Sequence, residues 1–521
     1  MKKIISILLF ACAGALAACD FLDVVPEGQA TQEDIFKTSK EARKYLNTLY
    51  TYAPNIAAYR YMPDFCAGDD IITATNGQTR YFPYKSMLYN EENASQTYYG
   101  LWDATTSSPS GRTNYDMYKG IRYCYIMIDN IDAVPGISPS VADEFKGEAY
   151  FLIANINTIL EHCENDRSVL SESNYELIKG ECLALRAMLH FEMFRIFGPI
   201  YSYEPGKVCI PYSDDTEKNV KPLLSAIDVV DKILTDLNQA ENLLLNVDPV
   251  ITKGPQSSAE GNNRLRYRNL RLNYFAVQAL TARVYLYAGN TTEAGRYARK
   301  VISGASKFFP FATREQVNGQ AATGTVNREA EDRIFSSEVL FGAYNTQRST
   351  DIYDKLFSNK LELKNLLTMT ENGVKALYDD EGDLRTCHFQ ALRDIEANDG
   401  RFFVKYGFVT DGDLGYASII PILRISEMYL IVAECEKSLT WVNDLRSARK
   451  AAQVSSGGSL DGSIEDEYVR EFIGEGQLFW YYKRKGITEI PRLYNRSAGD
   501  MKIELSNYQF DLPDKELAER K

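Results

Sequence analysis

The chain is poor in the side chains that most enzyme and metal sites use. Its 521 residues include only three histidines and three tryptophans. His162, His190 and His388 lie apart from one another and from any serine or cysteine nucleophile pattern. No two cysteines have the spacing of a zinc or redox motif, and no spacing among the 71 acidic residues indicates a glycosidase pair. We therefore expect a protein that is not an enzyme, with no catalytic residue, no metal and no cofactor.

Basic runs are also missing. Lys plus Arg number 58 against 71 for Asp plus Glu, which gives a net charge of −13. Such a chain would repel a phosphate backbone, so we expect no nucleic-acid partner. The hydrophobic share of 45% and the charged share of 25% are those of an ordinary folded protein. This composition excludes collagen-like, disordered and disulfide-scaffold chains.

Residues 1–18 have the pattern of a secretory leader. Lys2 and Lys3 precede an apolar segment that is too short to span a membrane as a stable helix. The sequence Leu-Ala-Ala-Cys that ends at Cys19 resembles the bacterial lipobox, in which the cysteine is acylated. We expect a lipoprotein signal peptide over 1–18 and a lipid on Cys19. No later segment has 18 uninterrupted apolar residues, so this lipid would be the membrane attachment.

The body of the chain is predicted to be mainly α. Apolar residues recur at helical spacing over residues 31–51, 117–132 and 173–197. The third segment has charged arcs on two sides and apolar surface between them, which indicates a helix packed between two neighbours. Gly198 followed by proline is predicted to end it.

Two segments each predict a pair of helices joined by a short turn. They are residues 268–303 and 422–450. In the first, Gly289 is predicted to end one helix, and Asn290 to cap the next in a capping box with Glu293. Helix pairs of about 34 residues resemble tetratricopeptide repeats, although here they are weak and separated by insertions.

Long segments without helical period separate the helices. They lie at 52–116, 198–221, 304–370 and 379–421, and insertions of this length are usually functional. The runs 338–344 and 401–408 predict strands in small β-hairpins. Strands and helices do not alternate, which disfavours Rossmann and barrel enzymes. The acidic run 379–383 crowds carboxylates like a calcium loop but lacks its last glutamate, so we interpret it as a solvated turn.

Spaced blocks along the chain resemble the SusD/RagB family of outer-membrane nutrient-binding lipoproteins of Bacteroidota. Each block alone is weak, but the ordered set spans residues 19–513. Ser426, Gln477 and Tyr481 depart from the family pattern, which suggests a divergent branch. The blocks are residues 19–26, 118–131, 181–199, 279–298, 383–385, 424–446, 467–486 and 512–513.

The resemblance implies one SusD-like domain over 19–521, in which tetratricopeptide-like helix pairs carry a loop-rich ligand-binding half. The insertions near 52–116, 304–370 and 379–421 would build that half. The protein would be lipid-anchored in the outer membrane, at the cell surface. It would capture a nutrient, most simply an oligosaccharide, and deliver it to a SusC-like TonB-dependent transporter. Two alternatives stay open: the same architecture binding peptides, or a surface scaffold or adhesin without transport.

Candidate ligand contacts lie in the insertions. Sugars are held by flat aromatic faces and by polar groups that bond to hydroxyls, although loop aromatics also serve as packing. The resemblance places contacts in the tyrosine-rich segment 52–116 and the opposing wall in the mid-chain insertion. Trp441 and Trp480 lie on helical blocks and are expected in the core. The candidates are Asp69, Asp70, Arg80, Tyr81 and Trp102 on one side, and Tyr344 and Arg348 on the other.

Overall fold

The computed structural model describes residues 72–75, 78–81 and 140–512, the last range with interruptions. The longest interruptions are 256–264, 359–367, 392–399 and 491–500. Helices dominate the described residues, as predicted. Cys19 and the helices expected over 31–51 and 117–132 lie outside them.

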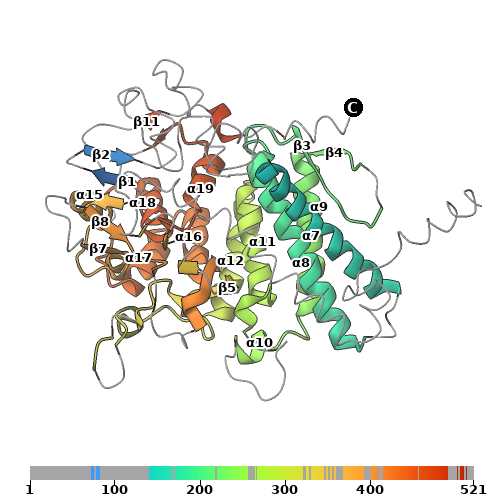
Figure 1. Cartoon of the computed structure of the whole chain (residues 1–521), viewed down its shortest axis with the longest axis horizontal. Helices are drawn as coiled ribbons and strands as arrows, with labels where there is room; N and C mark the ends of the chain where they lie inside the picture. Colours follow the sequence, from blue (N-terminus) through green and yellow to red (C-terminus); the bar gives the residue numbers. More distant parts are fainter. Residues whose placement is uncertain are drawn as a thin grey trace, which may run out of the picture.

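Three long helices form one end of the molecule (Figure 1). They are α7 (Ser140–Asn165), α8 (Glu172–Phe197) and α9 (Ala226–Leu244). Nearly every residue of α8 is buried because α7 and α9 both pack against it. The helix ends where Gly198 takes an extended conformation. The predicted position of this helix between two neighbours is therefore confirmed.

Both predicted helix pairs are present, and each has a short connection. The first pair is α11 (Tyr274–Tyr287) and α12 (Thr291–Ala305), and the second is α16 (Ile425–Glu436) and α17 (Leu439–Ala448). Helices α12 and α16 contact each other, so the two pairs stack although they are far apart in sequence. Trp441 on α17 is only partly buried, whereas Trp480 is in the core as expected.

The remaining helices extend this array or fill connections. Helices α18 and α19 follow the second pair toward the carboxyl end of the chain, and α18 contacts α16 and α17. The bounds are α10 (Val250–Lys253), α13 (Arg314–Val317), α15 (Glu371–Leu377), α18 (Leu460–Phe472) and α19 (Leu478–Lys485).

Asn290 caps α12, but the predicted capping box is incomplete. The side-chain oxygen of Asn290 accepts from the backbone N–H of Glu293 at 3.1 Å. The carboxylate of Glu293 bonds to the guanidinium of Arg296 instead of reaching back. The backbone N–H of Asn290 donates to the carbonyl of Tyr285. A charged partner three residues ahead competes better for this carboxylate than a neutral N–H does.

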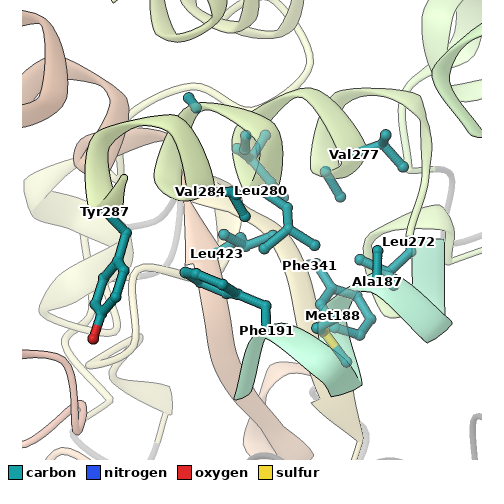
Figure 2. Packing of buried hydrophobic residues seen from close by; sticks show 14 of the residues in the cluster. Ala187, Met188, Phe191, Leu272, Val277, Leu280, Val284, Tyr287, Phe341 and Leu423 are labelled. Atoms are coloured by element: carbon teal, nitrogen blue, oxygen red, sulfur yellow. The ribbon is translucent and has the colours of Figure 1, made fainter. Parts of the chain in front are cut away.

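Strand β5 (Val339–Tyr344) is predicted correctly, but it is not part of a hairpin. It pairs antiparallel with β9 (Ile419–Arg424), far along the chain. Figure 2 shows Phe341 and Leu423, one from each strand, directed toward Leu280 of α11. All three side chains are buried in the main core. This two-stranded ribbon therefore belongs to the helical core, although its sequence lies in the loop-rich insertions.

The insertions also meet in a five-stranded antiparallel sheet with the order β2-β1-β6-β8-β7. It takes two strands from segment 52–116, one from 304–370 and two from 379–421. Figure 1 shows it at the opposite end of the molecule from α7, α8 and α9. The strands are β1 (Ile72–Thr75), β2 (Gln78–Tyr81), β6 (Thr368–Thr370), β7 (Phe389–Ala391) and β8 (Gly400–Phe403).

Two further two-stranded pairs lie at the edges of the helical array. Strand β3 (Val208–Pro211) pairs with β4 (Leu223–Ser225) in the connection between α8 and α9. Strand β10 (Glu489–Ile490) pairs with β11 (Met501–Lys502) after α19.

Asn273 ties the start of α11 to the ribbon, and we predict that Asn273→Ala destabilises the protein by about 2–4 kcal/mol. Its side-chain oxygen accepts from the N–H groups of Phe275 and Ala276, and its amide donates to the carbonyl of Leu340 at 2.7 Å. The change removes a cap and leaves buried polar groups without partners. Asn290→Ala removes only an exposed cap and should cost about 1 kcal/mol. Urea denaturation measures both, and equal losses would contradict the prediction.

Candidate functional site

The five-stranded sheet is the candidate site because it joins all three long insertions. Its register places five residues in one cross-strand row, one from each strand. Neighbouring strands lie about 4.8 Å apart, so the row extends over about 19 Å. The row consists of Tyr81, Ile72, Thr368, Phe402 and Gln390.

The structure separates the predicted site residues into two groups. Arg80 and Tyr81 lie on β2, at an edge of the five-stranded sheet. Tyr344 ends β5 in the two-stranded ribbon, and Arg348 follows it. These two residues therefore do not belong to the sheet that carries Arg80 and Tyr81. The other candidates, Asp69, Asp70 and Trp102, lie outside the described residues.

Arg348 has a structural use in the described part of the chain. Its side chain is 2% exposed, and one guanidinium nitrogen donates to the carbonyls of Tyr416 and Ile419 at 3.0 and 2.8 Å. Burial lowers the pKa of Arg348 to about 10. The residue thus holds the start of β9, and its contact with a ligand stays a prediction.

Polar side chains that the sequence did not single out lie on and beside the sheet. Arg401 on β8 pairs with Glu371 of α15 at 2.6 Å, and both remain partly exposed. Gln390 on β7 is exposed. A hydrogen bond from Lys375, followed by the charge of Arg401, lowers the pKa of Glu371. Gln390 pairs with Phe402, the residue after Arg401, so Gln390 and Arg401 lie on opposite faces of the sheet. One face therefore has a guanidinium beside an ionised carboxylate and the other has an amide, and all of these groups can hydrogen-bond to sugar hydroxyls.

A set of ionic side chains, buried except for Asp379, attaches this loop-rich half to helices α17 and α18. Its members come from both sides of the junction and form salt bridges with one another. We call it the arginine–carboxylate network. It consists of Arg385, Lys405, Arg424, Arg446, Arg449 and Arg470 with Glu338, Asp379, Asp383, Glu467, Glu471 and Glu475.

Glu471 of α18 is the centre of the network. Its carboxylate accepts from Arg449 at 2.5 Å, from Arg424 at 2.5 Å and from Arg385 at 3.1 Å. Arg449 also holds both oxygens of Glu338, at 2.6 and 2.7 Å. Arg449 lies at the end of α17, and Glu338 immediately precedes β5. One helical carboxylate is thus linked to three separate segments of the chain.

The network is electrically balanced, with equal numbers of positive and negative groups. Burial alone would raise the pKa of Glu471, but the charges of Arg449 and Arg424 together hold it well below its ordinary range. Burial alone would likewise lower the pKa of Arg449, and its attraction to Glu338 and Glu471 raises it instead. Glu471 and Arg449 are therefore charged at neutral pH. Their large desolvation cost is offset only while each keeps its partners.

The network explains several of the sequence blocks and corrects one interpretation. The acidic run 379–383 is a solvated turn only in part, because Asp379 and Glu381 are exposed whereas Asp383 is buried. Asp383 is 1% exposed and bonds to Arg385, and Asp379 pairs with Arg446 at 2.8 Å. Asp380 accepts from the backbone N–H of Ala452. The block at 383–385 therefore serves the junction between the two halves.

The described part of the chain holds no group of three or more His, Cys, Asp or Glu side chains placed to bind a metal. Its cysteines are free thiols. His190 is buried and stacks on Tyr212 at 3.8 Å, and burial lowers its pKa to about 3. His190 therefore has a packing role. No described helix has the length and apolar character needed to cross a bilayer.

Comparison with known proteins gives consistent results. A family model described as "Starch-binding associating with outer membrane" matches residues 150–261, the region of α8 and α9. The curated SusD-like protein P38 of Formosa agariphila is 23% identical over 372 residues, which cover 68% of this chain. The chain spans 58% of the length of that relative.

Solved structures resemble the whole architecture. A SusD superfamily protein from Bacteroides thetaiotaomicron superposes with a TM-score of 0.63 at 20% identity, covering 92% of this chain and 98% of that one. A SusD superfamily protein from Bacteroides vulgatus superposes with a TM-score of 0.64 at 19% identity, covering 92% of this chain and 97% of that one. A laminarin-binding SusD-like protein superposes with a TM-score of 0.58 at 16% identity, with the same coverage of 92% of this chain and 97% of the other.

The mainly helical fold of this chain is thus shared with solved structures of SusD superfamily proteins. The family-model match and the curated relative agree with this, so the chain is similar to SusD-like proteins both in sequence and in fold. The resemblance of the ordered sequence blocks is confirmed.

We predict that Glu471→Gln destabilises the protein by about 3–5 kcal/mol. The change removes one buried charge and leaves Arg385, Arg424 and Arg449 partly uncompensated. Glu293→Gln is the matched control, because Glu293 forms an exposed ion pair with Arg296 that is worth about 0–1 kcal/mol. The free energy of unfolding in urea should separate the two variants. Similar small losses would mean that the network contributes no more than a surface pair.

Proposed function

We propose that this chain captures a glycan at the cell surface and passes it to a TonB-dependent transporter. The observation that carries the proposal is the sheet in which three insertions meet, at the end of the molecule opposite α7, α8 and α9. Such a platform can hold an extended ligand without burying it. The family description and the laminarin-binding structural neighbour support a glycan as that ligand.

The chemistry beside the sheet suits binding better than hydrolysis. A glycosidase needs a carboxylic acid whose pKa is raised so that it can donate a proton. The pKa of Glu371 is instead lowered by Lys375 and Arg401. Its carboxylate is an acceptor for hydroxyl groups and a poor proton donor. We infer a binding protein that makes and breaks no covalent bond.

Transport then depends on an anchor and a partner. A lipid on Cys19 would hold the protein at the outer membrane, and residues 19–521 would act as one domain. Anchoring keeps the local concentration of the two partners high. The stacked helix pairs offer broad, rigid faces of the kind that repeat proteins use for protein contacts. We infer that such a face rests on the transporter while the sheet receives the ligand.

We predict that calorimetry on the chain without its leader detects binding to at least one glycan in a panel of starch, laminarin and their oligosaccharides. Tyr81→Ala should weaken that binding several-fold, since a stacked aromatic contributes about 1 kcal/mol. Tyr267→Ala is the control, because Tyr267 is an exposed tyrosine that precedes the 3₁₀ helix Arg268–Leu270, far along the chain from the sheet strands. Binding to a peptide panel and to no glycan would favour the peptide-binding alternative.

We also predict that mild-detergent extraction of outer membranes recovers the chain together with a TonB-dependent transporter at near-equal stoichiometry. An interface that survives detergent needs well over roughly 1,000 Å² of buried area, which stacked helices can supply. Cys19→Ala should release the chain from the membrane fraction and reduce recovery of the transporter. Recovery of the anchored chain alone, with the neighbouring transporter expressed, would favour the scaffold or adhesin.

A further inference from the structure

Two hollows in the described residues differ in size and in chemistry. The first lies between α8, α11, α18 and α19 and leaves about 40 Å³. The hydroxyls of Tyr287 and Tyr468 and one guanidinium nitrogen of Arg195 border it without hydrogen-bond partners among the described residues. This volume has room for a few water molecules, which would supply hydrogen bonds to those groups, and it is too small for a sugar.

The second hollow is an open groove of about 650 Å³. It lies between the turn that follows α8 and the 3₁₀ helix Leu505–Tyr508. Small-molecule sites usually measure roughly 300–1,000 Å³, so the groove is large enough for one or more sugar rings. It borders β3, which Figure 1 places well away from strands β1, β2 and β8 of the five-stranded sheet.

Tyr203 forms an aromatic wall of this groove. The residue is 56% exposed, which is unusual for a large aromatic side chain. Its ring lies against Gly486, where an added Cβ would come within 2.5 Å of the ring. Gly486 has a φ of +59° and ends α19, so a rigid backbone turn supports the ring. Ile200, which is 5% exposed, supplies apolar surface beside it.

Polar groups with cancelling charges surround the ring. Glu204 pairs with Lys207 at 3.1 Å, and both side chains are about half exposed. The ammonium of Lys207 also donates to the side-chain oxygen of Gln509 at 2.7 Å. Ser506 adds an exposed hydroxyl. The groove therefore offers donors and acceptors side by side, without a net charge that would select an ionic ligand.

We propose that this groove is a second glycan-binding site, in which a neutral sugar ring stacks on Tyr203. Its hydroxyls would hydrogen-bond to Glu204, Lys207 and Ser506. A sugar ring has one flat CH face and a polar rim, which match an aromatic wall bordered by donors and acceptors. The inference rests on the proposed capture of glycans and adds a site apart from the sheet. Two separated sites on one rigid scaffold favour long chains over short ones through multivalency.

The test compares Tyr203→Ala with the wild-type chain on the glycan polymer that the wild type binds and on its short oligosaccharides. Loss of stacking should weaken polymer binding roughly three- to ten-fold, while the melting temperature stays unchanged because the side chain is exposed. Tyr203→Phe keeps the ring and should retain most of the affinity. Tyr267→Ala, at a tyrosine that is 43% exposed, is the matched control and should bind like the wild type.

The outcomes separate this inference from the proposed function. If the wild type binds a glycan and Tyr203→Ala binds polymer and oligosaccharides equally well, the groove is not a glycan site and glycan capture still stands. If the wild type binds no glycan in the panel, both proposals fail. If Tyr203→Ala weakens only the binding of a peptide, the groove is a peptide site and the inference is overturned. A sugar ring on Tyr203 in crystals soaked with the oligosaccharide would support it directly.

Discussion

Three arginines on one buried glutamate are the constraint on which the described structure depends. Glu471 fixes Arg385, which precedes β7, Arg424, which precedes α16, and Arg449, which follows α17. The insertions do place apolar side chains in the main core, such as Phe357 and Phe403, but apolar contacts are not directional and leave the position of an insertion on the helical scaffold less well defined. Charge pairing in a dry junction is directional and costly to break, so it defines that position where apolar packing would not.

The helical half of the fold could be predicted because it follows from local patterns. Helix α8 and the pairs α11–α12 and α16–α17 are fixed by apolar periodicity and by residues such as Gly198 and Asn290. The strand at Val339–Tyr344 was also visible, but its partner was not. Its pairing with Ile419–Arg424 is long-range, and no local pattern specifies which distant strand completes a ribbon.

The candidate site was harder to predict for a related reason. Segment 52–116 was recognised from its length and its aromatics, and it does contribute Arg80 and Tyr81 to the shared sheet. Arg401 and Glu371 were missed because isolated charges in an insertion resemble a solvated surface. The network residues were missed as a network because charged side chains are usually exposed. The sequence did contain one signal of the network. Glu467 and Glu471 lie one helical turn apart in a single block, with Arg470 between them.

A junction fixed by charges allows the two halves to change independently. Side chains on the sheet can vary without disturbing Glu471. The salt bridges that attach the insertions involve residues outside the five sheet strands, such as Asp383, Lys405 and Arg424. The groove at Tyr203 is built differently, from the turn after α8 and the 3₁₀ helix Leu505–Tyr508, neither of which belongs to the three insertions that form the sheet. Sequence change in the insertions would therefore alter what the sheet binds while the groove kept its shape. If both proposed sites bind glycan, ligand specificity would reside in the sheet, and the groove would add affinity for any chain long enough to reach it.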